Sequence, residues 1–463
     1  MALRSRNAAV LVKIQAAEGT YEDPVAGTDG IKVEVPQISF RPQNTDTDEV
    51  TGSLDNAAPL VGGMQVEISI PFYLKGVAVP GDLPQWGDLF RISGWSETQT
   101  RTQLAGITFS VTGTNTIGDT ANGMGAIKSG TPIYLSSPKN PGVELLVSVA
   151  AAGSLTVTKL DGSAPVLVNE AAGGAFTISY GVPAVVASAG DNVSATAIAP
   201  WANVAQQYRG MPTLVSVNPA AAFFTSIIDY LATRVATFAD RFAAPLGATS
   251  VLAIPANVVY RPISAAIPCA SLAVYSDGIV FKFKDARGSV SLEMTAARVW
   301  KATVRISALF VSKTDAAVPA VTYDGTIPGV YRKSRFLINR LKAAIRSMSF
   351  DNGNSMVFPE DPNEDEGFSA PMITRRDMRA TLDPQQRLVA TANLLDDFRQ
   401  GNPQPIHAAI LGGNAAKPGG RIMFNAPIAL FIQNDPGDRD GIMTEQIQAK
   451  LDGADAGAFL TVF

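Results

Sequence analysis

The stretch from Gly63 to Gly76, GMQVEISIPFYLKG, constrains the fold more than any other part of the chain. Apolar residues occupy alternate positions from Met64 to Leu74, and mostly polar residues lie between them. Because side chains alternate faces along a β-strand, this pattern predicts a long strand with one apolar and one wetter face. Pro71 has no backbone N–H to donate, which predicts an edge position or a bulge there.

The same two-residue period returns between Trp300 and Phe310, which predicts a second long two-faced strand. Shorter alternating runs at 279–284 and 289–294 predict strands on either side of a turn at DARG (285–288). Glycine and proline are plentiful and scattered, with 40 and 30 residues, as turn-rich β proteins require. The fold class is therefore predicted to be mainly β.

The last third of the chain repeats the plan of the first. In the first, residues 1–30 look like an arm with a short strand near Leu11, and a predicted strand at 31–40 precedes a long loop without periodicity. A short helix beginning near Pro84 and closed by Gly94 follows the Gly63 strand. In the last third, a strand at 344–350, a long acidic loop, a strand from Leu388 and a short helix in LLDDFRQGN follow in the same order. This parallel order predicts an internal duplication.

Composition changes after about Thr102, and residues 103–200 are rich in alanine, glycine, serine, threonine and valine. Short strand-like runs separated by turn residues predict a small β-sandwich module here. After these runs, apolar residues at three- and four-residue steps between Phe224 and Phe242 predict an amphipathic helix, capped by Asn218 and ended by Pro245. We expect this helix to pack on its own module, although a membrane or partner helix is the sharper alternative.

Several function classes are disfavoured by the residue counts. The 463 residues include one cysteine, Cys269, and one histidine, His407, which excludes an internal disulfide framework and the usual zinc sites. A net charge of −4 argues against general affinity for nucleic acid. No nucleophile-and-base motif or phosphate-binding loop is recognisable, so we expect no enzyme activity and no cofactor. We expect His407 and Cys269 to serve core or interface packing.

Neither an export leader nor an 18-residue apolar run is recognisable in the sequence. We therefore expect assembly in a cytoplasm and no membrane span.

Five blocks of sequence carry a family resemblance: LVKIQAAEGTYEDP, the stretch GGMQVEISIPFYLKGVAVPGDLPQWGDLFRISGWSET, the long segment from DGIVFKFKDARG to AVPAVTY, IRSMSFDNGN, and DPGDRDGI. Together, in this order and spacing, they resemble the two-domain tail tube proteins of long-tailed bacteriophages. The resemblance covers roughly residues 1–102 and 258–463. The chain departs from the simple family pattern at 103–257, which we interpret as an inserted module.

The resemblance implies two tandem tail-tube β-sandwich domains, each with a short flanking helix. The first domain would comprise 1–102 and 258–328, the second 329–463, with the inserted β-rich module at 103–257. In such a family one sheet of every domain joins its neighbours, so that a trimer imitates a six-fold ring and stacked rings form a tube. Closing the sheet between chains removes the edges that otherwise aggregate. A barrel of ~24 strands spaced about 4.8 Å apart and tilted by ~40° has a bore of roughly 40 Å, wide enough for a DNA duplex.

The two long acidic loops are the most informative polar features of the sequence. The resemblance favours loops that reach toward the next ring, and calcium binding or a solvated surface are the alternatives. The candidate residues are Asp46, Asp48, Glu49, Asp361, Glu364, Asp365 and Glu366, with Asp55 and Glu360 beside them. In NDPGDRDGI, the spacing of Asp435, Asp438 and Asp440 lacks the terminal glutamate of a calcium loop, which favours a plain β-turn.

A basic run follows the linker at 312–331. Pairing with acidic loops of a neighbouring subunit, a solvated face and nucleic-acid binding are the three interpretations, and the last is disfavoured because a DNA conduit should not hold its cargo. The candidates for subunit contacts are Arg332, Lys333, Arg335 and Arg340, with Lys342 and Arg346 following.

The resemblance therefore implies a structural virion protein that conducts DNA from capsid to host. Its expected partners are copies of itself, other tail proteins (tape measure, terminator and baseplate) and passing double-stranded DNA. We expect a net acidic bore, an outward insertion and, because an outward module would obstruct a sheath, a non-contractile tail. Another ring-forming tail component (terminator or baseplate), or a secreted β-sandwich adhesin or carbohydrate-binding protein, are the alternatives.

Overall fold

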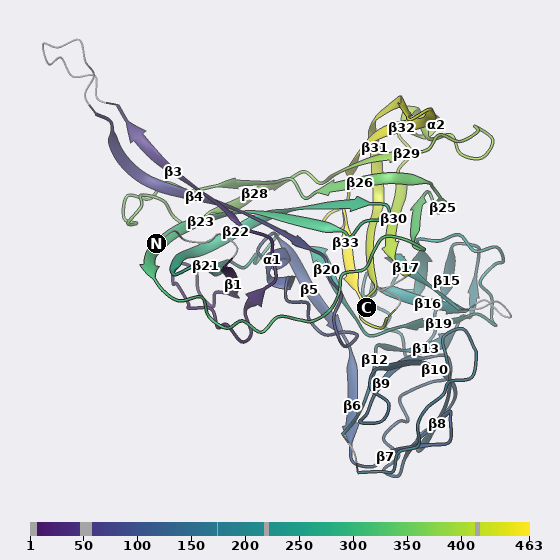
Figure 1. The fold of residues 1–463 in the computed structure, drawn as a ribbon. Helices are drawn as coiled ribbons and strands as arrows, with labels where there is room; N and C mark the ends of the chain where they lie inside the picture. The colour runs from purple at the N-terminus through teal and green to yellow at the C-terminus, as the bar shows by residue number, and fades with distance from the viewer. Residues whose placement is uncertain (1–6, 47–57, 174, 217–221, 413–416) are drawn as a thin grey trace, which may run out of the picture.

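The computed structural model describes residues 7–46, 58–173, 175–216, 222–412 and 417–463. The protein is mainly β, as the alternating sequence predicts (Figure 1). One 17-stranded sheet takes its strands from the first 100 residues and from residues after 256, where β27 (Asn354–Val357) and β28 (Met372–Arg376) form a separate two-stranded sheet, and two 7-stranded sheets are built from the residues between.

Eight strands form the continuous centre of the large sheet, and every neighbouring pair is antiparallel. We call them the eight-stranded sheet. In spatial order they are β3 (Gln37–Thr45), β4 (Leu60–Tyr73), β23 (Lys301–Asp315), β22 (Ile279–Thr295), β26 (Ile345–Asp351), β29 (Arg379–Pro384), β32 (Ile442–Leu451) and β31 (Ile422–Arg439).

The eight-stranded sheet is a tandem repeat of one four-stranded arrangement. In chain order, the first half contributes β3, β4, β22 and β23, and the second half contributes β26, β29, β31 and β32. Both halves place these strands in the spatial order first, second, fourth, third. The flanking strands repeat as well, because β1 (Ala8–Ile14) pairs with β21 (Ala270–Ser276) as β24 (Arg335–Ile338) pairs with β30 (Gln404–Ile410).

The two short helices occupy equivalent places in the repeat. Helix α1 (Gly87–Arg91) follows β4, and helix α2 (Leu394–Gln400) follows β29, as the sequence predicts. Each contains the pattern Asp-x-Phe-Arg, at 88–91 and 396–399. Asn393 caps α2 by accepting a hydrogen bond from the backbone N–H of Asp396, and Gly401 ends it with a left-handed conformation.

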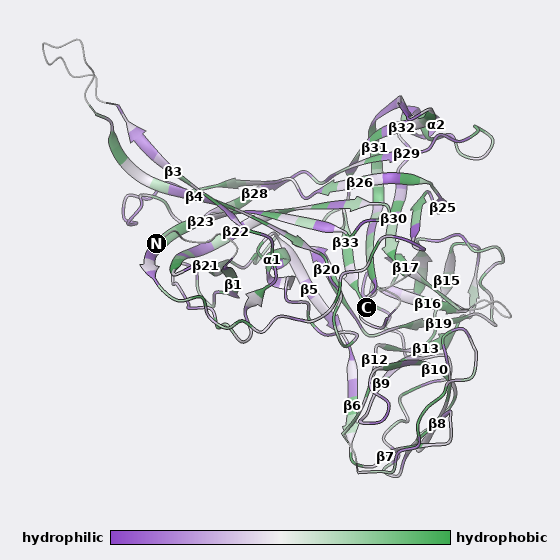
Figure 2. Cartoon of the chain, viewed as in Figure 1, coloured by the Kyte–Doolittle hydropathy of each residue, from purple (hydrophilic) through white to green (hydrophobic). Residues whose placement is uncertain are grey.

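The core lies on the apolar face of the eight-stranded sheet. Alternate residues of β4 and β23, such as Ile68 and Ile306, are buried, and they stand directly opposite each other in the ladder. Phe350 of β26 and Phe424 of β31 continue the same core into the second half. In Figure 2 the hydrophobic residues are concentrated in β30, β31 and β33 (Phe459–Val462), while β3 carries hydrophilic residues.

The insertion replaces the turn of a β-hairpin. β5 (Trp95–Thr100) pairs with β20 (Asn257–Pro262), and Thr100 stands directly opposite Asn257. Between them the chain builds two modules in succession, each with its own hydrophobic core. The first module contains β6 (Thr102–Gly106), β7 (Phe109–Thr112), β8 (Thr116–Asp119), β9 (Pro132–Ser136), β10 (Val143–Ala151), β11 (Ser154–Thr158) and β12 (Phe176–Tyr180). The second contains β13 (Val182–Val186), β14 (Ala189–Gly190), β15 (Ser194–Thr196), β16 (Pro212–Ser216), β17 (Phe223–Tyr230), β18 (Val235–Phe238) and β19 (Val251–Ile254).

The predicted amphipathic helix in the insertion is wrong. Residues 223–238 form the antiparallel strands β17 and β18, joined by a turn in which Arg234 has a positive φ of 64°. Aromatic and β-branched residues dominate β17, and these favour strands. The predicted cap, Asn218, lies outside the described residues.

Three smaller predictions are also corrected. DARG is not a turn, because β22 runs through it with a bulge at Asp285, whose φ is 56°. Leu388 and Val389 do not begin a strand and are instead exposed ahead of α2. Residues 8–14 do not belong to a free arm, because β1 is paired along its whole length with β21 and its centre is buried.

Candidate functional site

The opposite face of the eight-stranded sheet is polar along its whole width. Its side chains alternate with the buried ones of the same strands, and we call it the polar face. It presents Ser39, Arg41, Glu67, Ser69, Thr303, Arg305, Ser291, Glu293, Ser349, Asp351, Arg379, Thr381, Gln446, Gln448, Asp435 and Arg439. Charges of both signs are mixed on it, for example in the Arg41–Glu67 ion pair of 2.6 Å, so this face is not predominantly acidic.

Both outer strands of the eight-stranded sheet have an open edge. Among the described residues, β3 pairs only with β4. β31 pairs with β30 and β33 in its first part, but beyond residue 429 only with β32. An unpaired row of backbone N–H and C=O groups is a template for another strand.

The two halves meet at a strand junction inside the chain. The end of β22 pairs with β26, with Leu292 opposite Phe350 and Glu293 opposite Ser349. The ladder continues where Asn352 donates its backbone N–H to the carbonyl oxygen of Val290 at 3.0 Å. We call this contact the internal junction, and it makes one sheet out of two repeated halves.

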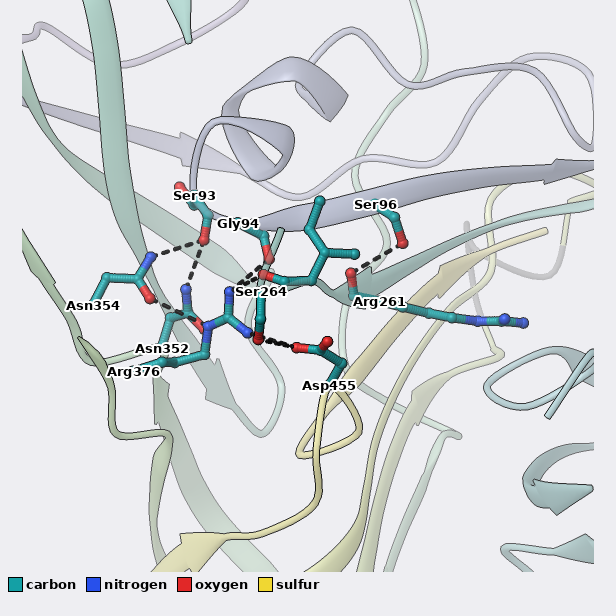
Figure 3. A network of polar contacts seen from close by, with 10 residues as sticks. Ser93, Gly94, Ser96, Arg261, Ser264, Asn352, Asn354, Arg376 and Asp455 are labelled. Atoms are coloured by element: carbon teal, nitrogen blue, oxygen red, sulfur yellow. Dashed lines mark hydrogen bonds and ion pairs between the residues drawn. The ribbon is translucent and has the colours of Figure 1, made fainter. Parts of the chain in front are cut away.

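Polar side chains of the second half fix the end of α1 at this junction (Figure 3). Asn352 and Asn354 each donate a side-chain N–H to the carbonyl oxygen of Ser93, at 2.9 and 2.8 Å. Arg376 donates to the carbonyl oxygens of Gly94 at 2.9 Å and Ile263 at 2.6 Å. Burial lowers the pKa of Arg376 from its usual value, in keeping with a guanidinium enclosed by carbonyl groups.

An aromatic chain lies beneath these hydrogen bonds. The ring of Phe90 in α1 contacts Trp95, and Trp95 contacts Phe350 of β26, with centroid separations of 5.7 and 6.1 Å. Phe350 is 1% exposed. Phe350 of the second half therefore packs against the strand that follows α1, beneath the side chains that hold the carbonyl groups of Ser93 and Gly94.

The predicted acidic loops have different surroundings. Asp46 follows the end of β3, whereas Asp48, Glu49 and Asp55 lie outside the described residues. In the second loop Glu366 accepts a hydrogen bond of 2.9 Å from the backbone N–H of Met64, so this loop rests on β4 of the same chain.

The rest of the second acidic loop faces outward. Glu360, Glu364 and Asp365 are exposed, and Asp361 is half-buried. The backbone N–H and side chain of Asn363 hold the pKa of Asp361 below its usual value. Within the described residues no group of three or more histidine, cysteine or acidic side chains is arranged to hold a metal ion.

The basic run docks the insertion as well as reaching solvent. Arg335 forms an ion pair of 2.7 Å with Asp240 of the second module and stacks over Phe223. Arg340 donates to the carbonyl oxygen of Phe238 at 3.2 Å, and burial lowers its pKa. These two predicted subunit contacts are therefore engaged within the chain, while Arg332 and Lys333 are exposed.

One docking contact escaped the sequence analysis. Arg421 binds Glu144 of the first module through two hydrogen bonds of 2.7 and 2.6 Å, and both side chains are largely buried. The guanidinium also lies over the rings of Phe224 and Phe463. The partners are 277 residues apart, and no local pattern marks such a pair.

Two further residues lie where the sequence predicts. His407 and Cys269 are both buried, and the Nδ1 atom of His407 lies 2.6 Å from Oδ1 of Asn425. Burial lowers the pKa of His407.

No family model matches the chain, and no curated protein matches it either. Among the helices of the described residues, none is long and apolar enough to cross a membrane.

Proposed function

We propose that this protein is the structural subunit of a tail tube of the kind made by long-tailed bacteriophages. Its copies would assemble through their open sheet edges into rings, and the rings would stack into a tube that conducts DNA from capsid to host. Its partners would be other copies, the tape measure, terminator and baseplate proteins, and passing DNA. It would act in the virion tail after assembly in the bacterial cytoplasm. No catalytic residue or cofactor takes part in this function.

The observation that carries the proposal is the repeated half joined by the internal junction. Two equivalent halves already share one sheet through strand edges, and the same kind of edge stays open at both ends. A repeated unit with open, complementary ends is a unit for polymerisation. Three copies would supply a barrel of ~24 strands with a bore of roughly 40 Å.

The chemistry of the polar face suits a DNA conduit. If the apolar face is covered by the flanking strands and helices, the polar face lines the bore. Acidic and basic side chains alternate there, and several are paired, such as Arg41 with Glu67. A nearly balanced surface offers no continuous cationic track for phosphates, so DNA can pass without being held. We therefore propose a bore of nearly balanced charge in place of the net acidic bore expected from the sequence.

Electron microscopy of the purified full chain tests the proposal. We expect tubes of uniform diameter with a lumen of roughly 40 Å, as the strand count requires. Single rings that never stack would favour a terminator or baseplate component instead. A chain that stays monomeric at high concentration would refute the proposal.

A further inference from the structure

We propose that the internal junction is copied between chains, so that β3 of one copy pairs with the end of β31 of the next in a defined register. The inference rests on the proposed function and adds which residues meet. The occupant of both open edges is a second copy of this chain.

The projecting hairpin is the first reason. β3 and β4 extend far beyond the body of the molecule (Figure 1), and Leu60 and Val61 near their outer end are 62% and 73% exposed. The equivalent hairpin of the second half does not project, because β27 (Asn354–Val357) lies against β22 and Asn354 is locked to Ser93. A two-stranded ribbon alone in water is marginally stable, so the first hairpin needs a surface.

The two halves can be aligned residue by residue through their ladders. In the first half Phe40 stands opposite Val66, and Val66 opposite Ala308. In the second half Phe350 stands opposite Ala380, and Ala380 opposite Ala449. In each half, the next strand of the sheet has a bulge beside these paired residues, in β22 between residues 284 and 287 and in β31 between residues 431 and 433. Phe40 is therefore equivalent to Phe350, and the bulges fix the equivalence of β22 and β31.

The register between copies follows from this alignment. After the bulges, Arg287 is opposite Ser307 and Gln433 is opposite Gln448, which makes Leu292 equivalent to Asp438. Since Leu292 pairs with Phe350 inside the chain, Asp438 would pair with Phe40 of the next copy. By the same step Arg439 would stand opposite Ser39, and Gly437 opposite Arg41.

The charges at this contact are complementary on the polar face. Asp435 of β31 lies on the same face as Arg41 of β3, two residues from Gly437, which would stand opposite Arg41. Phe40 is 39% exposed, whereas its equivalent Phe350 is 1% exposed. In the proposed contact the neighbour covers Phe40, as the first half covers Phe350.

The helices show the same asymmetry. Helix α1 has buried residues and is locked by the second half, whereas α2 has none. α2 is therefore placed to receive the hairpin of the next copy, and Asn44 stands four residues after Phe40 as Asn354 stands four residues after Phe350.

Prolines limit the edge contact to this register. Pro436 is equivalent to Val290 and Pro42 to Asn352, the pair whose backbone hydrogen bond extends the internal junction. Neither proline has an N–H, so the ladder between copies must stop there. Such prolines protect an open edge against pairing in other registers.

Cysteine crosslinking tests the register. Glu293 and Ser349 form a pair without direct backbone hydrogen bonds, because Val290 and the alternate residues after it bond toward β26. Such pairs have Cα atoms about 4.5 Å apart, within the range of a disulfide. The intermolecular equivalent is Ser39→Cys with Arg439→Cys in one chain.

We expect this double variant, assembled and mildly oxidised, to form covalent oligomers that close at the number of copies in a ring and revert on reduction. The control pair Arg41→Cys with Arg439→Cys is displaced by two residues and should not crosslink. The pair Glu293→Cys with Ser349→Cys should crosslink within one chain, which checks folding and oxidation.

Two outcomes overturn the inference in different ways. If wild-type rings or tubes form but the displaced pair crosslinks, or neither intermolecular pair does, the register is wrong and the proposed function stands. If the wild-type chain does not assemble at all, the proposed function fails and the inference falls with it.

Discussion

Replacing Phe350 by alanine should mainly destabilise the single chain, whereas replacing Phe40 should mainly weaken assembly, although the two residues are equivalent in the repeat. Phe350 is 1% exposed and contacts Trp95 and Phe424. Phe350→Ala should therefore lower the free energy of unfolding of the single chain by about 3–5 kcal/mol. Phe40 contacts Phe281 and Phe310 on one side only and is 39% exposed, so Phe40→Ala should cost about 1–2 kcal/mol.

The larger effect of Phe40→Ala should be on assembly. A phenylalanine side chain that buries about 200 Å² has about 80 Å² left to cover when it is 39% exposed. At about 25 cal/mol per Å², covering it contributes about 2 kcal/mol per interface, so Phe40→Ala should weaken each contact about 30-fold.

Urea unfolding followed by tryptophan fluorescence, at concentrations below assembly, measures the first effect, and sedimentation across a concentration series measures the second. Ile107→Ala, at an exposed site of the insertion, is the control and should change neither. The reasoning is refuted if Phe40→Ala destabilises the single chain as much as Phe350→Ala and leaves assembly unchanged.

Three further predictions concern the internal contacts. Glu144→Ala should lower the unfolding free energy by about 3–5 kcal/mol, because it removes the carboxylate from the largely buried guanidinium of Arg421; a loss below about 0.5 kcal/mol in urea titration would contradict this. Asn354→Ala should cost about 1–3 kcal/mol, because the carbonyl oxygen of Ser93 loses a donor, and protection of amide hydrogens in α1 should fall; unchanged exchange there would count against the lock. Burial lowers the pKa of His407 below its ordinary 6.5. At acidic pH the unfolded chain therefore binds a proton at this residue more readily than the folded chain does, so the free energy of unfolding should fall as the pH drops below about 6.5. His407→Asn should reduce the difference between the urea midpoints at pH 7.5 and 5.5. If the difference is unaltered, the pH dependence of stability arises from other titratable groups.

The long strands could be predicted because their signals are local, whereas the duplication was predicted from the order of elements, although the strand assigned from Leu388 lies instead at Arg379–Pro384. The alternating stretches around Ile68 and Ile306 predicted two-faced strands, and the structure pairs them directly. Both short helices were predicted, the first from Pro84 near its start and Gly94 after its end.

Strands β17 and β18 of the second insertion module were predicted as a helix because the spacing of their apolar residues also fits the helical period. In β17, consecutive buried residues from Thr225 to Ile228 arise because the strand is covered on both sides, and this run also resembles one face of a helix. The long loop after Phe40 was only partly a loop, since β3 continues to Thr45 through polar residues that face water.

The surroundings of the candidate site depend on contacts that sequence cannot encode locally. Arg335 was predicted to meet a neighbouring subunit, and its described ion pair is with Asp240 of the same chain. Predicting it requires knowing that the insertion folds back onto the second half. The internal junction is likewise a pairing between residues about 60 positions apart, 292 and 350, and only the ladder shows it.

The place of the insertion makes the chain modular. Because Thr100 and Asn257 face each other across a ladder, a two-residue turn would join β5 to β20 without moving either strand. The same two ends would accept any other domain whose termini lie about 5 Å apart, the spacing of neighbouring strands. A tube built from such subunits would carry a regularly repeated, exchangeable cargo on its outside, while the sheet that holds the polymer together stays the same.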